Sequence, residues 1–298
     1  MVDADRLARL RAAIEPHGLE DVAVTQAQGD AANLVARAIR AGATLVVTFG
    51  GDGIVNEAVQ TLIDTDTALV TIPGGNANVF ARATGWPRSP DHAISALGKA
   101  LEVALPRQLR LGRIQAAGLD RVIALNAGLG IDAETVRWVE DHPTIKRHLR
   151  HVAYAAAASA AARSLSQHPL ALEVTSDGIS VGPASSLMVA VGHPYTYMGR
   201  RPVDILPSVD FDGGLAWLAM RATRKREFAR IGAGIMVTAG AIPGESALLG
   251  TANDAIVVRS DTDVAVQVDG EAVGRHREVR IGHGGDITIL DPSLKSVD

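Results

Sequence analysis

The chain has 298 residues, of which 47% are hydrophobic and 21% are charged, and its formal net charge is −4. This composition is typical of a globular protein with a large core, and it excludes a disordered chain, a collagen-like repeat and a coiled coil. The absence of cysteine excludes disulfides, zinc–thiolate sites, iron–sulfur clusters and thiol nucleophiles. The negative charge and the aromatic content of 3% argue against nucleic acid as a partner.

The N-terminal residues lack the charged-then-apolar pattern of a secretory signal and instead begin an amphipathic helix. No apolar window reaches the roughly 18 residues that a membrane-spanning helix needs. We therefore expect a cytoplasmic protein without a transmembrane segment.

The first third of the sequence alternates helices and strands. The spacing of apolar residues predicts helices over residues 4–15, 31–41 and 54–63. Short apolar, β-branched runs predict strands over residues 21–25, 44–49 and 68–72. This alternation with short connections predicts an α/β domain with a parallel sheet.

After about residue 107 the pattern changes to short strands separated by turn signals. Strands are predicted over residues 121–126, 171–175, 186–191, 214–220, 255–259, 264–268 and 286–290, and helices over 133–140, 149–166 and 224–238. We therefore expect a nucleotide-binding α/β domain over residues 1–107 and a mainly antiparallel, β-rich domain over 108–298, whose last residues return to the first domain.

A glycine-rich loop follows the strand predicted over residues 44–49. In the sequence TFGGDGIVNEA (residues 48–58), three glycines and Asp52 join the strand directly to a helix. Glycines permit close backbone approach, and free N–H groups at a helix start favour an anion. Asp52 would repel a bare phosphate, so it suits a phosphate-bound Mg²⁺ or a substrate hydroxyl. The alternative is an ordinary strand-to-helix turn with an aspartate N-cap.

A second glycine-rich loop, TIPGGNANVFAR (residues 71–82), follows the next predicted strand. Loops after neighbouring parallel strands meet at the carboxyl edge of the sheet, where open α/β sheets bind ligands. Neither loop is a Walker A motif or a GxGxxG fingerprint. The remaining interpretation is a nucleoside triphosphate held by backbone amides without a P-loop lysine.

These loops and three further motifs resemble the diacylglycerol kinase catalytic-domain family, which includes bacterial diacylglycerol kinases, sphingosine kinases and ceramide kinases. The motifs are GGDG (50–53), PGGNANVFAR (73–82), NAGLGIDAE (126–134), LPSVDFDGGL (206–215) and VDGE (268–271). The resemblance covers nearly the whole chain. It implies an N-terminal, NAD kinase-like α/β domain and a β-rich domain that binds the lipid substrate.

The activity implied by the resemblance is ATP-dependent phosphorylation of a lipid hydroxyl, with Mg²⁺ as cofactor and the lipid taken from a membrane surface, at the inner membrane face for a cytoplasmic enzyme. The implied nucleotide contacts are Thr25, Gly50, Gly51, Asp52, Gly53, Ile54, Val55, Asn56, Gly75, Asn76 and Asn78. The lipid remains open among diacylglycerol, sphingoid bases, ceramide and glycolipid precursors. A homodimer is compatible with the sequence.

The resemblance also implies roles for carboxylates. Glu271 matches the general base of bacterial relatives, whereas sphingosine kinases assign that role to the aspartate matching Asp52. We assign the base to Glu271 and the metal and nucleotide side to Asp52. Asp132 lies where relatives recognise the lipid head group. Val209, Asp212 and Gly214 match a structural Mg²⁺ loop.

The sequence departs from the family pattern at two loop positions and at its start. Ile54 and Asn76 stand where relatives usually carry hydroxyl residues, although Asn76 retains an amide donor. Relatives open with a strand and an Asn-Pro-x-Ser-Gly turn, so we expect either that the native protein begins some tens of residues upstream of Asp3 or that this variant lacks part of its nucleotide site. Two alternatives therefore stay open: an NAD kinase-like enzyme with a soluble substrate, and a nucleotide-binding regulatory protein that does not catalyse.

Overall fold

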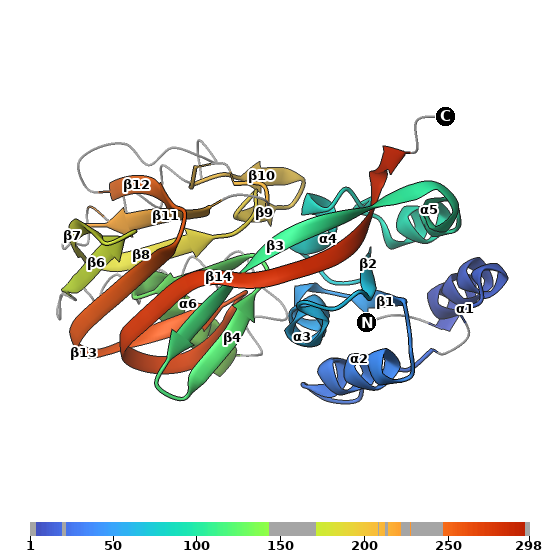
Figure 1. The fold of residues 1–298 in the computed structure, drawn as a ribbon, viewed down its shortest axis with the longest axis horizontal. Coiled ribbons are helices and arrows are strands. Elements are labelled where there is room, and N and C mark those ends of the chain that lie inside the picture. The colour runs from blue at the N-terminus through green and yellow to red at the C-terminus, as the bar shows by residue number, and fades with distance from the viewer. Residues whose placement is uncertain are drawn as a thin grey trace. The chain divides into compact units, whose positions relative to one another are not determined.

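The computed structural model describes residues 4–19, 22–142, 171–207, 209–211, 214–221, 227 and 247–295. The chain divides into two compact units (Figure 1). Unit 1 comprises Met1–Leu111 and Gly285–Asp298, and unit 2 comprises Gly112–Gly284. Strands β3 (Ala104–Ala116) and β14 (Glu271–Lys295) carry the chain from one unit to the other.

Unit 1 is built around parallel strands. Its helices are α1 (Ala4–Ile14), the 3₁₀ helix η1 (Glu15–His17), α2 (Asp30–Arg40), α3 (Asp52–Leu62), α4 (Val79–Ala83) and α5 (Pro90–Val103). Strand β1 (Leu45–Gly50) pairs in parallel with β2 (Ala68–Pro73), and β2 pairs in parallel with Thr288 and Ile289 of β14. The predicted N-terminal α/β domain with a parallel sheet is therefore confirmed.

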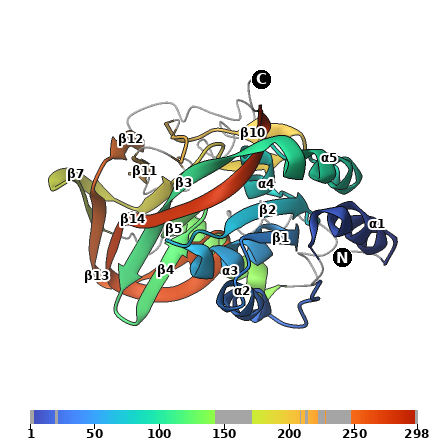
Figure 2. The ribbon, with the colours of Figure 1, turned by 45° about the vertical axis from the view of Figure 1, so that its right-hand side comes forward.

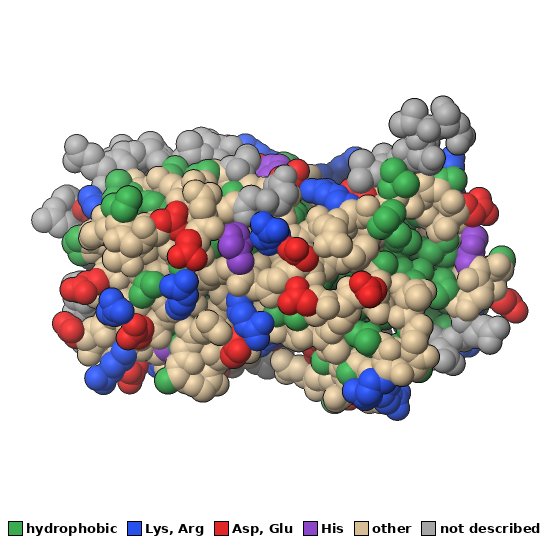
Figure 3. All heavy atoms as spheres, in the orientation of Figure 1, with side chains coloured by type: hydrophobic (Ala, Val, Ile, Leu, Met, Phe, Trp, Pro, Cys, Tyr) green, Lys and Arg blue, Asp and Glu red, His purple; other side chains and the backbone are tan. Residues whose placement is uncertain are grey.

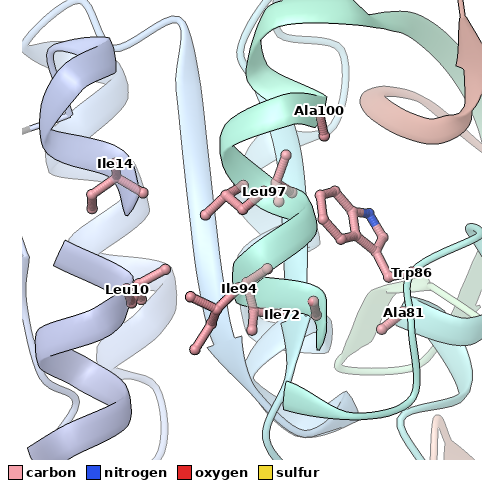
Figure 4. Packing of buried hydrophobic residues seen from close by; sticks show 10 residues of the cluster. Leu10, Ile14, Ile72, Ala81, Trp86, Ile94, Leu97 and Ala100 are labelled. Carbon is pink, nitrogen blue, oxygen red and sulfur yellow. The ribbon is translucent and has the colours of Figure 1, made fainter. Parts of the chain in front are cut away.

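Helices cover both faces of this sheet. Figure 2 shows β1 and β2 between the helix pair α1 and α5 and the helix pair α2 and α3. On the first face, Leu10 of α1, Leu97 of α5 and Ile72 of β2 belong to one buried cluster (Figure 4). Burial on both faces explains why β1 and β2 read as continuous apolar runs rather than as alternating patterns.

One strand predicted in this unit is wrong. Residues 22–25, predicted as part of a strand over 21–25, have irregular structure. Val22 packs against the core of unit 1, but Val24 is 61% exposed and no strand pairing is formed by residues 22–25. Such a short apolar run forms a strand only where it can exchange hydrogen bonds with a neighbouring strand, and the local sequence does not report that partner.

Unit 2 is an antiparallel sheet with one described helix. Its elements, besides parts of β3 and β14, are β4 (Leu119–Ile123), β5 (Asn126–Leu129), α6 (Ile131–Asp141), β6 (Leu172–Ser176), β7 (Ile179–Ala184), β8 (Ser186–Ala190), β9 (Thr196–Met198), β10 (Arg201–Val203), β11 (Leu215–Met220), β12 (Ala247–Ala252) and β13 (Ala255–Val268). The strand order β14-β13-β5-β8-β11-β12 is antiparallel throughout. The predicted antiparallel, β-rich character of this region is confirmed.

The predicted strands differ from those in the structure at two places. The strands expected over 255–259 and 264–268 are a single strand, β13, with a register shift against β14 between Arg259 and Val264. The strand expected over 121–126 is divided into β4 and β5. The helices predicted over 149–166 and 224–238 lie outside the described residues, apart from the single residue Glu227.

Charged side chains in unit 2 form ion pairs between neighbouring strands. Arg113 of β3 contacts Asp120 on the β3–β4 hairpin, with an Nε–Oδ1 distance of 2.5 Å, and Arg259 of β13 contacts Glu278 of β14 at 2.8 Å. Figure 3, in the orientation of Figure 1, shows acidic and basic side chains interspersed over the face turned toward the viewer. Across the described ranges, no helix is both long and apolar enough to span a bilayer.

The cluster of Figure 4 generates a stability prediction. Leu97 is fully buried between α1 and β2, so Leu97→Ala leaves a cavity and is expected to lower the free energy of unfolding by roughly 2–5 kcal/mol. Urea titration followed by circular dichroism measures the loss. Lys99→Ala, at an exposed position of the same helix, is the matched control and should change stability little. Equal stability of the two variants would contradict this packing.

Candidate active site

The two glycine-rich loops contact each other through their backbones. Because β1 and β2 are parallel, the loops that follow them leave the same edge of the sheet. The N–H of Gly74 donates to the carbonyl of Gly50 at 2.6 Å. A Cβ atom on Gly75 would lie 2.6 Å from the Cα of Gly51, and one on Gly74 would lie 3.1 Å from the Cα of Gly50. The loops can approach this closely only because these positions are glycine.

Asp52 joins the start of α3 to the start of α4. Its Oδ1 accepts a hydrogen bond from the N–H of Phe80 at 3.0 Å. Asn78, which has a positive φ of 47°, binds the backbone of Gly75 through both ends of its side-chain amide. Burial raises the pKa of Asp52, and the backbone N–H groups of α4, with that of Phe80 foremost, partly offset this shift. Asp52 therefore caps α4 and is a partly desolvated carboxylate beside the loops.

The remaining nucleotide residues predicted in unit 1 occupy different environments. Asn56 is buried, and Asn76 is exposed on the second loop. The side chain of Ile54 packs over Gly50: a Cβ atom added to Gly50 would lie 2.7 Å from Cγ2 of Ile54. Thr25 lies in the irregular segment before α2. Glu57 of α3 ties the end of that segment down by accepting from the N–H groups of Gly29 and Ala31 at 2.8 and 3.0 Å.

In unit 2 the NAGLGIDAE and VDGE motifs come together. Strand β5 pairs with β13, with Ala127 opposite Val268. The turn after β13 is anchored by Asp269, whose carboxylate accepts from the N–H groups of residues 124, 125 and 126 at 2.8–2.9 Å. Burial raises the pKa of Asp269 to about 6, against the opposing effects of these hydrogen bonds and of Arg121.

The same turn presents Glu271, and Arg121 of β4 forms an ion pair with it. Both side chains are 23% exposed, so the pair is accessible without being fully solvated. This charge-assisted contact restricts the orientation of the Glu271 carboxylate, the candidate base.

Asp132, the predicted head-group residue, lies at the first turn of α6. Its Oδ2 accepts from Nε2 of Gln267 at 2.6 Å and from the hydroxyl of Tyr195 at 3.0 Å. Burial raises the pKa of Asp132, and both hydrogen bonds lower it, that from Gln267 more. A Cβ atom on Gly128 would overlap this carboxylate, which explains one glycine of NAGLG.

The structure therefore brings together Gly50, Gly51, Asp52, Gly75 and Asn78 in unit 1, and Asp132 and the Glu271 turn in unit 2. Of the three residues predicted for the Mg²⁺ loop, Val209, which is buried, and Gly214 are described, whereas Asp212 lies outside the described residues. Among the residues the structure describes, no cluster of three or more histidine or carboxylate side chains is arranged to hold a metal.

Sequence reasoning missed the polar residues that support these side chains, chiefly Gln267, Arg121 and Asp269. A signal for Gln267 was present. It is a lone amide within the otherwise apolar strand sequence VAVQV, and a buried strand carries such a residue only where its side chain is hydrogen-bonded.

Comparison with known proteins finds a family match in the first third of the chain. Residues 3–106 match the diacylglycerol kinase catalytic domain. The predicted resemblance is thus confirmed, and the loops described above lie inside the matched residues.

Curated relatives match part of the chain. A protein of Stenotrophomonas maltophilia named "Probable lipid kinase YegS-like" is 34% identical over 140 residues, which cover 45% of this chain and 43% of that protein. The "Diacylglycerol kinase" of Mycobacterium tuberculosis is 28% identical over 205 residues, covering 66% of this chain and 61% of that protein. The chain thus matches less than two thirds of the length of these relatives.

Solved structures share the fold across the chain. A diacylglycerol kinase from Bacillus anthracis superposes with a TM-score of 0.67 at 18% identity, covering 96% of this chain and 90% of that chain. An NAD kinase from Archaeoglobus fulgidus in complex with ATP gives a TM-score of 0.53 at 14% identity, covering 98% of this chain and 91% of that chain. These likenesses establish an NAD kinase-like fold, as the sequence predicts.

The contact between the loops predicts that alanine is not tolerated at residue 75. Gly75→Ala places a methyl group against the backbone of Gly51, so we expect a stability loss of about 1–3 kcal/mol by overpacking. Thermal unfolding of the variant measures this loss. Gly98→Ala is the matched control because its new Cβ would have no neighbour closer than 3.8 Å. A Gly75→Ala protein as stable as this control would refute the contact.

The raised pKa of Asp269 predicts a pH dependence. Its pKa rises from 3.8 in the unfolded chain to about 6 in the fold, so between these values the folded state binds more protons. The free energy of unfolding therefore falls as the pH rises from about 4 to about 6, and Asp269→Asn should flatten this slope by up to about 1.4 kcal/mol per pH unit. Urea unfolding across that pH range measures both slopes. Parallel curves for the two proteins would contradict the shift.

Proposed function

We propose that this protein is an ATP-dependent lipid kinase that phosphorylates a hydroxyl group of diacylglycerol or a related lipid. One observation carries the proposal: two glycine-rich loops meet at the carboxyl edge of a parallel sheet, within a diacylglycerol kinase catalytic domain. Open α/β sheets bind nucleotides at this edge. The names of the curated relatives support a kinase of this type.

The loops fit a nucleotide that is bound mainly by backbone groups. Gly51 is the N-cap of α3 and has no side chain to cap the helix, which leaves that role to a ligand or solvent. We assign the triphosphate of ATP to the backbone of residues 50–56 and 75–78, with Thr25 on the segment tied to α3 by Glu57. Exposed Asn76 supplies an amide donor in place of the family's hydroxyl.

Asp52 fits a role toward Mg²⁺. Magnesium in kinase sites is usually held by one or two carboxylates together with phosphate oxygens. One Asp52 oxygen caps α4, which fixes the orientation of the carboxylate beside the loops. When bound, Mg²⁺ would neutralise the charge of the phosphates, as phosphoryl transfer requires.

In unit 2, Glu271 is the proposed general base and Asp132 the proposed acceptor for the lipid head group. The lipid hydroxyl oxygen forms a bond to the γ-phosphorus, the bond from that phosphorus to the bridging oxygen of ADP breaks, and Glu271 takes the hydroxyl proton. Arg121 restricts the orientation of Glu271 for this step. A water-insoluble substrate implies that the enzyme works at a membrane surface. For the cytoplasmic protein expected from the sequence, this surface is the inner face of the membrane.

The test is transfer of radiolabelled phosphate from ATP, with Mg²⁺, to a lipid panel containing diacylglycerol, ceramide and a sphingoid base. We expect one labelled lipid class, and we expect Glu271→Gln to reduce kcat by roughly 10²–10⁴-fold through loss of the base. Asp52→Asn should reduce activity and weaken its dependence on Mg²⁺ concentration. Thin-layer chromatography identifies the product.

Matched controls are Glu102→Gln and Asp66→Asn, which change exposed carboxylates away from the loops and should leave the rate unchanged. Labelling of NAD without any labelled lipid would replace the proposal with an NAD kinase activity. ATP binding without transfer to any acceptor would replace it with a regulatory, non-catalytic role.

A further inference from the structure

Gln267 is a buried amide that uses both ends of its side chain. It lies in β13 between buried valines and is 1% exposed. Nε2 donates to Oδ2 of Asp132 at 2.6 Å and to Oδ1 of Asn126 at 3.2 Å, while Oε1 accepts from the N–H of Gly270 at 2.8 Å. Because the Gly270 N–H can only donate, the oxygen of the amide must face it, and this fixes the amide orientation.

One end of this bridge is the proposed head-group acceptor. Gln267 and Tyr195 both donate to Oδ2 of Asp132, and within the part of the chain that the structure describes no hydrogen bond reaches Oδ1. The carboxylate is thereby held with one oxygen engaged by the protein and the other left to accept from a substrate donor. Asn126 completes the arrangement by donating from Nδ2 to the carbonyl of Tyr195 at 3.3 Å.

The other end of the bridge is the turn that presents Glu271. Asp269 and Gly270 both have positive φ, 50° and 83°, and Val268 pairs with Glu271 across the turn. This is the geometry of a tight two-residue hairpin turn. The Gln267 side chain binds the N–H of its second residue, next to Glu271 itself.

We propose that Gln267 is a positioning residue that holds the Asp132 carboxylate and the Glu271 turn in one fixed arrangement for the lipid substrate. The inference rests on the proposed lipid kinase function. Glutamine suits the task because it joins a donor and an acceptor on one side chain of sufficient length. Glutamate would keep the acceptor for Gly270 but place a second oxygen against Asp132, and leucine would lose both contacts.

Steady-state kinetics of Gln267→Glu and Gln267→Leu test the role. We expect the KM for the lipid to rise roughly 10- to 100-fold in both variants, as for the loss of a hydrogen bond to a charged group. The KM for ATP should stay within about twofold, since no nucleotide residue is touched. Only Gln267→Leu should also lower kcat, because it alone frees the Glu271 turn.

Gln115→Glu is the matched control, because Gln115 also binds an aspartate, Asp120, but on an exposed hairpin. It should leave both KM values unchanged. Lipid and ATP KM values that rise together in the Gln267 variants would indicate a general structural loss and overturn the positioning role. Unchanged lipid KM values would overturn it as well.

A second measurement does not depend on activity. Gln267→Glu should lower the urea midpoint of unfolding, and adding Asp132→Asn should regain at least half of the loss, because an amide at 132 can donate to a carboxylate at 267. Additive effects of the two substitutions would overturn the bridge. If no lipid is phosphorylated by the wild-type protein, the kinase proposal fails on that ground, while this double-mutant cycle still decides whether Gln267 is coupled to Asp132.

Discussion

The backbone contact between the two glycine-rich loops is the constraint on which the site in unit 1 depends. Gly51 meets Gly75 and Gly50 meets Gly74 with no room for a Cβ atom, and the Gly74 N–H binds the Gly50 carbonyl. This approach brings the start of α3 to the start of α4, so that Asp52 can cap α4. The glycines that suit a phosphate are therefore also required by packing before any ligand binds.

In unit 2 the candidate site residues are held by side-chain contacts rather than by backbone packing. These residues lie on a turn and a helix start, and buried or half-buried polar side chains hold them. Asp269 anchors the turn to the start of β5, Arg121 pairs with Glu271, and Gln267 links the turn to Asp132. A buried polar network of this kind is favourable only when its members are satisfied, which makes each member sensitive to substitution.

The sequence predicted the architecture well where the pattern is local. The runs at β1 and β2 and the glycine turns after them led directly to the parallel sheet, and turn signals led to the antiparallel strands. It failed at residues 22–25, where an apolar run found no partner strand, and at β4 and β5, where one predicted strand is two. For the candidate site, motif residues such as Asp52 and Glu271 could be predicted from the sequence, whereas the partners that contact them in the structure could not. The Arg121–Glu271 pair joins residues 150 positions apart, and no local pattern reports such a contact.

Strand β14 has a consequence for how the chain is made. Residues 288 and 289 pair with the start of β2, although more than 200 residues, including all of unit 2, are synthesised between them. During translation the first helices and strands of unit 1 therefore emerge long before the strand that completes their sheet. Until then, the edge of β2 offers unpaired backbone groups, which are a template for wrong association. A nascent chain of this protein should thus depend on protection of that edge, by a chaperone or by the ribosome itself, for most of its synthesis.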